Sequence, residues 1–266
     1  MLQLTNENYY TKEANKTYLS VSTYKNFSGT LFQKGCETQA MAILNGEYKK
    51  EPNTAMLIGS YVDSYIEGTL DQFKEKTPAL FKKDGTLKAD YVQADNIIAR
   101  MERDKHFMYY LSGEKQVIMT AELFGVQWKI KMDSYIPDKA IIDLKVVSDI
   151  YEKYYTKHSG YLNFIQAWGY DFQLAIYQAV VEANTGKKLP CYIAAADKGK
   201  TTNIELIQIT QNELDGALAG VQFGVNRIKA LISGEEQPER CGRCDYCKET
   251  KVITKPITMA DLLIES

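Results

Sequence analysis

Two aspartates and one lysine in neighbouring apolar segments are the residues whose types and spacing could do chemistry. Asp133 closes one predicted strand, and Asp143 and Lys145 lie two residues apart in the next. Because alternate residues of a strand share a face, Asp143 and Lys145 project together. The Pro137-Asp138 pair between the strands is typical of a turn, and a hairpin centred on Asp138 would place Asp133 directly opposite Asp143.

Two carboxylates that face each other repel unless a proton or a cation lies between them. Mg²⁺, or Mn²⁺ in its place, prefers such oxygen ligands, and the backbone carbonyl of Leu144 could add another. A lysine on the same face could orient a water or stabilise a phosphorane-like transition state. The spacing therefore predicts a metal-dependent hydrolytic site, and the alternative is a charged, solvated face of an edge hairpin.

A cysteine run near the C-terminus is a second candidate for metal chemistry. Cys241, Cys244 and Cys247 are spaced as Cys-x-x-Cys-x-x-Cys, and three thiolates at that spacing indicate metal ligation. A closed tetrahedral or cluster site needs a fourth ligand. Cys191 lies in an apolar strand and is predicted to be a core residue.

The composition excludes several classes of protein. The 266 residues are 45% hydrophobic and 25% charged, as in a folded globular chain and unlike a disordered or fibrous one. No apolar run approaches the ~20 residues that a membrane helix needs, and the N-terminus does not resemble a signal peptide, so we expect a cytoplasmic protein without a membrane partner. The net charge of −2 means that any nucleic acid must bind a local basic patch.

The elements that must position these residues are mostly helices in the first 110 residues and a mixture of strands and helices after them. Helices are predicted from Ser20 onward and over residues 54–67, 90–103, 161–184 and 212–232, with a short apolar helix at 259–264. Strands are predicted over residues 117–124, 126–133, 140–147, 189–196 and 203–209.

This order of elements predicts an α/β (α+β) fold with a central mixed sheet flanked by helices. We expect a single domain over residues 1–266. It would comprise a mostly helical part (1–110), a catalytic core (111–233) and a cysteine-rich tail with the short helix (234–266).

The motifs together resemble the PD-(D/E)XK nuclease superfamily, most closely its RecB-like and RecE-like phage or prophage exonucleases. The resemblance rests first on Asp133 followed by Asp143-Leu144-Lys145, with Met132 where a Pro usually precedes the first acid. It extends from Ser20 to Cys247 and implies a restriction-endonuclease-like core.

Two helical motifs add to this resemblance. Asp63 lies four residues after Gly59, where RecB-like nucleases have a Gly-x-x-x-His whose histidine reaches the metal. Its carboxylate could ligate Mg²⁺ instead, or it could be a solvated helix acid. Gln173 and Tyr177 match a Gln-x-x-x-Tyr motif on one helix face. There the amide could hold a phosphate or position Lys145, and the phenol could donate to a phosphate oxygen.

The resemblance also supplies the fourth cysteine. The segment before Cys36 resembles the one that precedes the lone N-terminal cysteine of AddB-type and CRISPR-associated RecB-like nucleases. In those families four cysteines hold a [4Fe–4S] cluster. The resemblance therefore implies that Cys36 joins Cys241, Cys244 and Cys247 in one site, with Zn²⁺ as the alternative because the tail spacing is tighter here.

The function that the resemblance implies is a Mg²⁺-dependent exonuclease that hydrolyses DNA at double-stranded ends in phage-type recombination or repair. A single-strand annealing recombinase is the expected partner. The implied metal ligands are Asp63, Asp133, Asp143 and Leu144, and the implied catalytic residues are Lys145, Asp143, Asp133, Gln173 and Tyr177. Candidates for DNA backbone contacts are Lys129, Lys131, Lys153 and Lys157. The alternatives are a structure-specific endonuclease and a non-catalytic DNA-binding module organised by the cysteine site.

Overall fold

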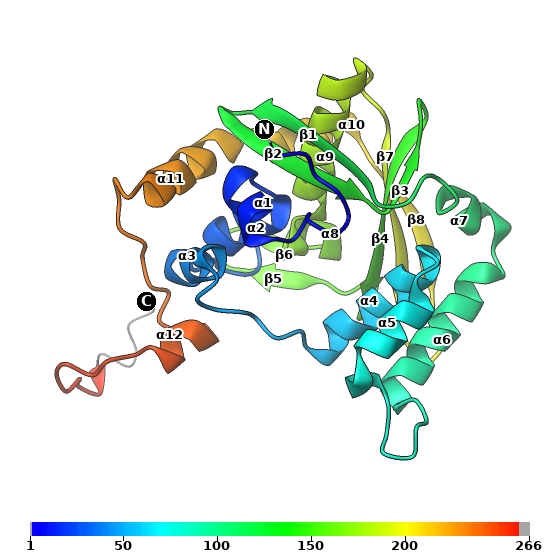
Figure 1. Ribbon diagram of the computed structural model, residues 1–266, viewed down its shortest axis with the longest axis horizontal. Helices are drawn as coiled ribbons and strands as arrows, with labels where there is room; N and C mark the ends of the chain where they lie inside the picture. Colours follow the sequence, from blue (N-terminus) through cyan, green and yellow to red (C-terminus); the bar gives the residue numbers. More distant parts are fainter. Residues whose placement is uncertain (1, 261–266) are drawn as a thin grey trace.

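A four-stranded mixed sheet forms the centre of the computed structural model, which describes residues 2–260 (Figure 1). The strands, in spatial order, are β3 (Ser134–Ile136), β4 (Ala140–Val147), β7 (Cys191–Asp197) and β8 (Ile204–Ile209). The β4 and β7 strands are parallel, and the two outer pairings are antiparallel. The strand that carries Asp143 and Lys145 is therefore paired on both sides.

Strand β4 is buried on both faces because it separates two hydrophobic clusters. Ile141 packs into one cluster together with Leu174 of helix α9 (Tyr170–Thr185). Leu144 packs into the other together with Val62 of helix α4 (Thr54–Ile66). A strand held from both faces and both edges can keep polar side chains at fixed positions, which is what a site built on it requires.

A long hairpin leaves the sheet at Asp133. Strand β1 (Val117–Leu123) pairs antiparallel with β2 (Val126–Met132), and Asp133 is the single residue between β2 and β3. Ser134 pairs with Ile142 in the β3–β4 hairpin, which is the register predicted from the sequence. Asp133 consequently lies at a bend in the chain, next to the middle of β4.

Helices flank the sheet on both sides, as expected for this fold class. Figure 1 shows α4 together with α5 (Leu70–Lys76), α6 (Ala89–Glu102) and α7 (Lys105–Tyr110) on one side. The opposite side holds α1 (Lys12–Thr17), α2 (Val21–Ser28), α3 (Glu37–Asn45), α11 (Val221–Ser233) and α12 (Asp245–Glu249). None of the helices within residues 2–260 combines the length and the apolar character that crossing a bilayer requires.

Two predicted helices are wrong in extent. The predicted helix 161–184 begins instead as strand β6 (Gly160–Leu162), continues as α8 (Phe164–Trp168) and becomes α9 only after Gly169. Gly169 adopts a left-handed conformation with φ of 62°, which interrupts the right-handed helix and ends α8. Glycine suits this position because residues with a Cβ atom disfavour that conformation. The predicted helix 212–232 likewise divides at Gly220, into α10 (Gln211–Leu218) and α11.

The other predicted elements agree with the structure to within two residues at each end, and Ser20 caps α2 as expected. A short hairpin of β5 (Tyr154–Thr156) and β6 was not predicted. The predicted helix 259–264 falls mostly outside the described residues.

Gly35 is the glycine whose substitution should test the packing of the loop between α2 and α3. A Cβ atom there would lie 2.2 Å from the Phe27 carbonyl oxygen and 2.5 Å from the Gly29 nitrogen, both backbone atoms. We expect Gly35→Ala to lower the free energy of unfolding by about 1–3 kcal/mol. Gly216→Ala, in an exposed position of α10 with open space around it, should raise it by about 1 kcal/mol. Chemical denaturation of both variants measures this, and an unchanged midpoint for Gly35→Ala would contradict the packing described.

Candidate active site and cysteine cluster

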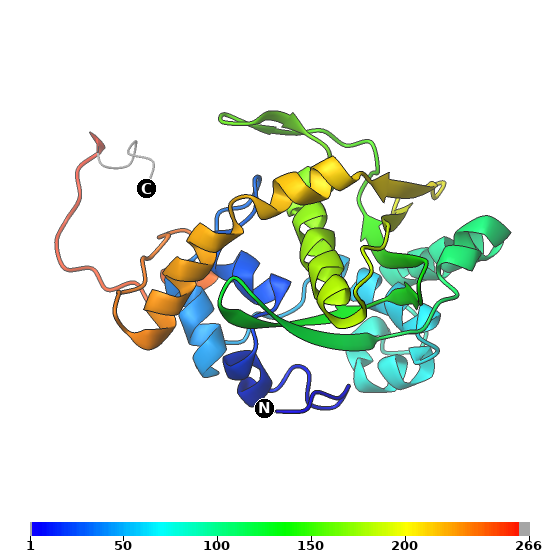
Figure 2. The same ribbon diagram turned by 90° about the horizontal axis from the view of Figure 1, so that it is seen from above.

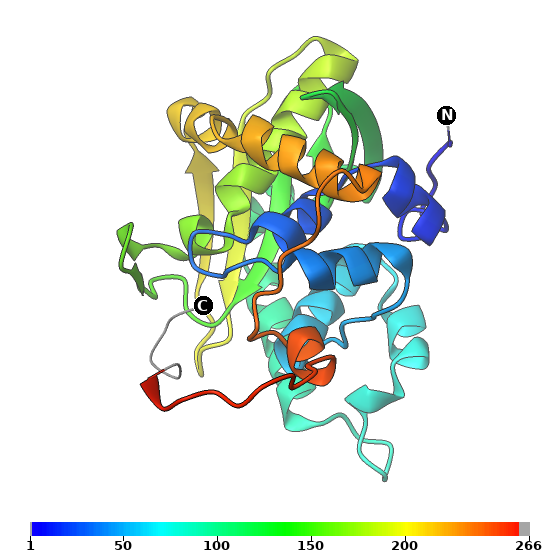
Figure 3. The same cartoon turned by 90° about the vertical axis from the view of Figure 1, so that its left-hand side faces the viewer.

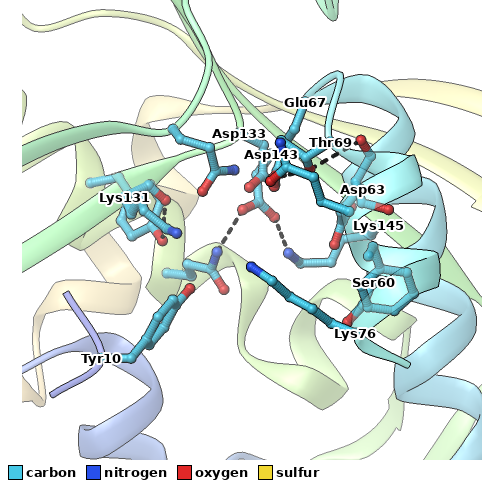
Figure 4. A pocket seen from close by; sticks show the side chains of 16 residues that line it. Tyr10, Ser60, Asp63, Glu67, Thr69, Lys76, Lys131, Asp133, Asp143 and Lys145 are labelled. Carbon is cyan, nitrogen blue, oxygen red and sulfur yellow. Dashed lines mark hydrogen bonds and ion pairs between the residues drawn. The ribbon is translucent and has the colours of Figure 1, made fainter. Parts of the chain in front are cut away.

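A cavity of about 540 Å³ opens between helices α4 and α5 on one side and strands β2 and β4 with helix α9 on the other (Figure 4). The structure brings six predicted site residues together in its lining: Asp63, Asp133, Asp143, Lys145, Gln173 and Tyr177. They come from three separate elements, α4, β4 and α9, and from the bend between β2 and β3, so only the tertiary fold assembles them.

The two facing aspartates are held by different parts of the hairpin. Asp143 is 2% exposed in the centre of β4. Asp133, at the bend, accepts a hydrogen bond on Oδ2 from the Leu144 backbone N–H at 3.0 Å. Asp63 is half-buried on α4 and reaches the cavity from the opposite wall.

Lys145 is the cation that neutralises part of this acidic cluster. Its Nζ forms an ion pair with Asp143 Oδ2, donates to the Leu144 carbonyl oxygen at 3.3 Å and lies 4.9 Å from the centre of the Tyr170 ring. Burial alone would lower the pKa of Lys145, but the charges of Asp143 and Asp133 raise it instead, so the side chain stays protonated.

The carboxylates themselves are destabilised by their environment. Burial, followed by the charge of Asp143, raises the pKa of Asp133 to about 7. Burial, followed by the charge of Asp133, raises the pKa of Asp63 well above its usual value. Lys145 alone does not neutralise Asp63, Asp133 and Asp143. The whole lining, which also includes Glu67, Lys76 and Lys131, holds four carboxylates against three lysines, so a proton or a further cation is favoured in this cavity.

The donor set fits a hard divalent cation. It consists of oxygens alone, from three carboxylates and the Leu144 carbonyl, and Mg²⁺ and Mn²⁺ bind such ligands. Asp143 Oδ2 is buried and accepts no well-formed hydrogen bond, only the Lys145 ion pair. Among residues 2–260, the carboxylate oxygens lie farther from one another than do the sulfur atoms of the four cysteines described below.

Gln173 and Tyr177 make contacts that differ from the predicted ones. The Gln173 side-chain amide donates to Asp143 Oδ1 at 2.6 Å and so holds the carboxylate in place. The Tyr177 hydroxyl donates to the Lys131 backbone carbonyl at 3.2 Å, which ties α9 to β2. Contact of either residue with a phosphate stays a prediction.

Lys129 is a corrected prediction. It is 1% exposed, and its Nζ donates to the Tyr9 carbonyl oxygen and to Asn15 Oδ1, because the N-terminal segment covers that face of β2. It therefore cannot contact a DNA backbone. Lys131, two residues further along, does line the cavity.

The cavity-lining residues that sequence reasoning missed include Tyr10, Glu67 and Lys76. Glu67 lies four residues after Asp63 on the same helix face, and that spacing could have indicated it. Tyr10 comes from the N-terminal segment, and its ring centre lies 4.6 Å from Lys131 Nζ. No periodic pattern marks Tyr10 or Lys76.

The four cysteines predicted to share a site lie together. The sulfur atoms of Cys36, Cys241, Cys244 and Cys247 are all within 4.8 Å of one another. Cys36 precedes α3 and Cys244 caps α12, and these helices lie side by side in Figure 3. Cys191, as predicted, is buried in the core of the sheet, away from this group.

The chemistry of the four thiols suits metal binding. The Cys244 N–H donates to Cys241 Sγ at 3.3 Å, and the Cys247 N–H donates to Cys244 Sγ at 3.4 Å. Although burial opposes it, backbone N–H groups lower the pKa of Cys241 to about 6. Thiolates rather than thiols ligate metals, so at least this ligand is available at neutral pH.

Comparisons with known proteins agree with this geometry. Residues 20–250 match a family described as "PDDEXK-like domain of unknown function (DUF3799)". A crystal structure described as a "putative exonuclease" from Eubacterium rectale superposes with a TM-score of 0.97 at 53% identity, over 99% of each chain. Another solved structure, SSO0001, has a TM-score of 0.30 at 13% identity, over 83% of this chain and 95% of that one, and carries no argument. No curated protein matches.

Asp63 offers a test of the electrostatics of the cavity. Because its pKa is raised in the folded protein, the folded state binds a proton that the unfolded state releases, and stability falls as pH rises above the usual carboxyl pKa. In metal-free buffer at pH 8, Asp63→Asn should raise the melting temperature by about 2–4 °C, the shift that 1 kcal/mol gives a chain of this size.

The same variant should be stabilised less than the wild type by added Mg²⁺, because it lacks one carboxylate ligand. Glu75→Gln, which removes an exposed acid from the neighbouring helix α5, is the matched control and should change neither property. A lower melting temperature for Asp63→Asn, together with an unchanged response to Mg²⁺, would show that Asp63 is a solvated helix acid and not a metal ligand.

Proposed function

The chain belongs to the PDDEXK-like family, within the PD-(D/E)XK nuclease superfamily, and we propose that it is a divalent-metal-dependent exonuclease that hydrolyses DNA phosphodiester bonds at duplex ends. The observation that carries this proposal is the meeting of Asp133, Asp143 and Lys145 in one cavity. The similarity to the E. rectale protein supports the exonuclease class.

The metal ligands and Lys145 would carry out the chemical step of this reaction. A divalent cation held by Asp133, Asp143, the Leu144 carbonyl and Asp63 would supply a bound water of lowered pKa and neutralise charge on the phosphate. Lys145, kept protonated by its acidic neighbours, donates a hydrogen bond to the attacking water or to a non-bridging phosphate oxygen.

The remaining residues position the reacting groups. Gln173 fixes the Asp143 carboxylate through its 2.6 Å hydrogen bond. Lys131 and Lys76 lie on opposite walls of the cavity and can contact the phosphates that flank the scissile bond (Figure 4). These contacts position the DNA without reading its sequence.

The biological setting that we propose follows from the family resemblance alone. It is a cytoplasmic role in phage-type recombination or repair, with DNA as the substrate and a single-strand annealing recombinase as the partner. Cleavage of a closed circular duplex would instead favour a structure-specific endonuclease.

For the cysteine site we propose a single Zn²⁺ ion rather than a [4Fe–4S] cluster. A tetrahedral zinc with Zn–S bonds of about 2.3 Å separates its sulfur ligands by about 3.8 Å. The Cys36 and Cys247 sulfurs are 3.6 Å apart, and those of Cys241 and Cys247 are 4.0 Å apart. An iron–sulfur cluster places each thiolate on a different iron, at the outside of the cluster, and so needs wider spacing.

Lys145 is the residue whose removal most directly tests catalysis. Lys145→Ala should lower kcat at least ~100-fold on an end-labelled linear duplex with Mg²⁺, because it removes a preorganised donor to developing charge. Lys131→Ala, the matched control on the cavity wall, should raise KM with a smaller change in kcat.

Thermal melting of Lys145→Ala shows whether the variant remains folded, since the change leaves Asp143 without its ion-pair partner. If folded Lys145→Ala digests the linear duplex at the wild-type rate, or the wild type digests it fully in the presence of EDTA, the proposed mechanism is wrong.

The cysteine site is tested by metal content together with stability. Purified protein should be colourless and contain one zinc per chain, and Cys36→Ser or Cys247→Ser should lose the zinc and lower the melting temperature. The double variant should cost less than the sum of the two, because both remove the same metal. Cys191→Ser, a change in the core, should lower stability but retain the zinc. Brown protein containing four irons per chain would overturn the zinc proposal.

A further inference from the structure

The hairpin of β5 and β6 presents two neighbouring tyrosines to solvent. It projects from the body of the molecule and lies at the top of Figure 2. Tyr155 and Tyr161 are directly paired across the hairpin and are 62% and 74% exposed. Their ring centres are 5.4 Å apart, so together they form one continuous aromatic surface.

The other face of the same hairpin packs against the body of the protein. Tyr154 pairs with Leu162, and both are buried. The Tyr154 ring packs against Phe32 and Trp168, with centres 5.0 and 5.9 Å away. Because a two-stranded hairpin is marginal by itself, this inner face is what attaches it to the protein. The outer tyrosines contribute no core packing.

Exposed basic side chains border this aromatic surface. Lys153 precedes β5, and Lys157 and His158 occupy the turn between the strands. Both acids between β4 and β5 are engaged in hydrogen bonds. Asp149 accepts one from the Tyr151 N–H at 2.8 Å, and Glu152 accepts from Ser148 Oγ at 2.6 Å and from the Tyr154 hydroxyl at 2.8 Å. From Lys153 to Leu162 the hairpin therefore carries two lysines and no acid, on a chain whose net charge is −2.

The hairpin is continuous with the catalytic strand. Strand β4 ends at Val147, two residues beyond Lys145, and the chain then runs into β5. The Lys198 N–H donates to the Val147 carbonyl at 3.0 Å, which brings a second basic loop, containing Lys200, to the end of β4. Lysines therefore lie both in the turn of the hairpin and in the loop beside the end of β4.

We propose that the β5–β6 hairpin is a stacking platform for single-stranded DNA, holding a strand that passes the end of β4. Aromatic faces bind unpaired bases, whereas the bases of a duplex are already stacked on one another. The basic border matches the phosphate backbone and would oppose pairing of this face with a second copy of the same chain. That the nucleic acid is DNA rests on the proposed function.

The test is equilibrium binding of a fluorescent oligothymidylate to proteins that all carry Lys145→Ala, so that cleavage does not interfere. Adding Tyr155→Ala and Tyr161→Ala should weaken binding at least ~10-fold, since stacking of each base contributes appreciably. Adding Tyr155→Phe and Tyr161→Phe should weaken it less than ~2-fold, because the rings remain. Tyr109→Ala, which removes a ring that is 51% exposed on α7, is the matched control.

The inference is overturned if the double alanine protein binds the oligothymidylate as tightly as its parent, or if the double phenylalanine protein loses as much affinity as the double alanine protein. It is also overturned if the parent is a dimer by sedimentation and the double alanine protein is a monomer. Failure of the nuclease proposal would be seen separately, as absence of cleavage by the wild type. It would not change the interpretation of the binding measurements.

Discussion

The concentration of negative charge between β4 and α4 is the constraint on which the site depends. The cavity lining carries four carboxylates, those of Asp63, Glu67, Asp133 and Asp143, against three lysines, and burial raises the pKa values of Asp63, Glu67 and Asp133. Such an arrangement costs stability in the absence of a further positive charge, and a fold keeps it only where the rest of the structure compensates. We propose that the same excess charge gives the cavity an affinity for a divalent cation.

The fold compensates by fixing the backbone around the cluster. Strand β4 pairs with β7 from Ile141 to Val147 and with β3 at its first three residues, and it is packed on both faces, so the backbone that carries Asp143 and Lys145 is held in place. The bend at Asp133 is fixed by the β3–β4 register on one side and the β1–β2 hairpin on the other. The cysteine cluster plays a comparable part at a distance, since it joins α3 near the N-terminus to α12 near the C-terminus.

Local patterns in the sequence predict those parts of the structure that depend on local geometry. The turn at Pro137-Asp138 predicts the β3–β4 register, and with it the approach of Asp133 to Asp143. The alternation of side-chain direction in a strand predicts that Asp143 and Lys145 share a face. The division of the helix at Gly169 was missed, because an isolated glycine within an apolar periodic segment is often tolerated in a helix. The burial of Lys129 was missed because it depends on the N-terminal segment, which is distant in sequence. Cys36 was linked to the other cysteines only through family resemblance, since no local pattern joins residues so far apart.

The most direct test of this account is to locate a divalent cation in the cavity. Anomalous diffraction from crystals soaked in Mn²⁺ should show a peak in contact with the carboxylates of Asp133 and Asp143 and with the Leu144 carbonyl oxygen, and Asp63 should reach it directly or through a water. In those crystals the Lys145 ammonium should have moved away from Asp143 Oδ2. A cavity without an anomalous peak, in which Lys145 still pairs with Asp143 at saturating Mn²⁺, would contradict the claim that the acidic cluster is a metal site.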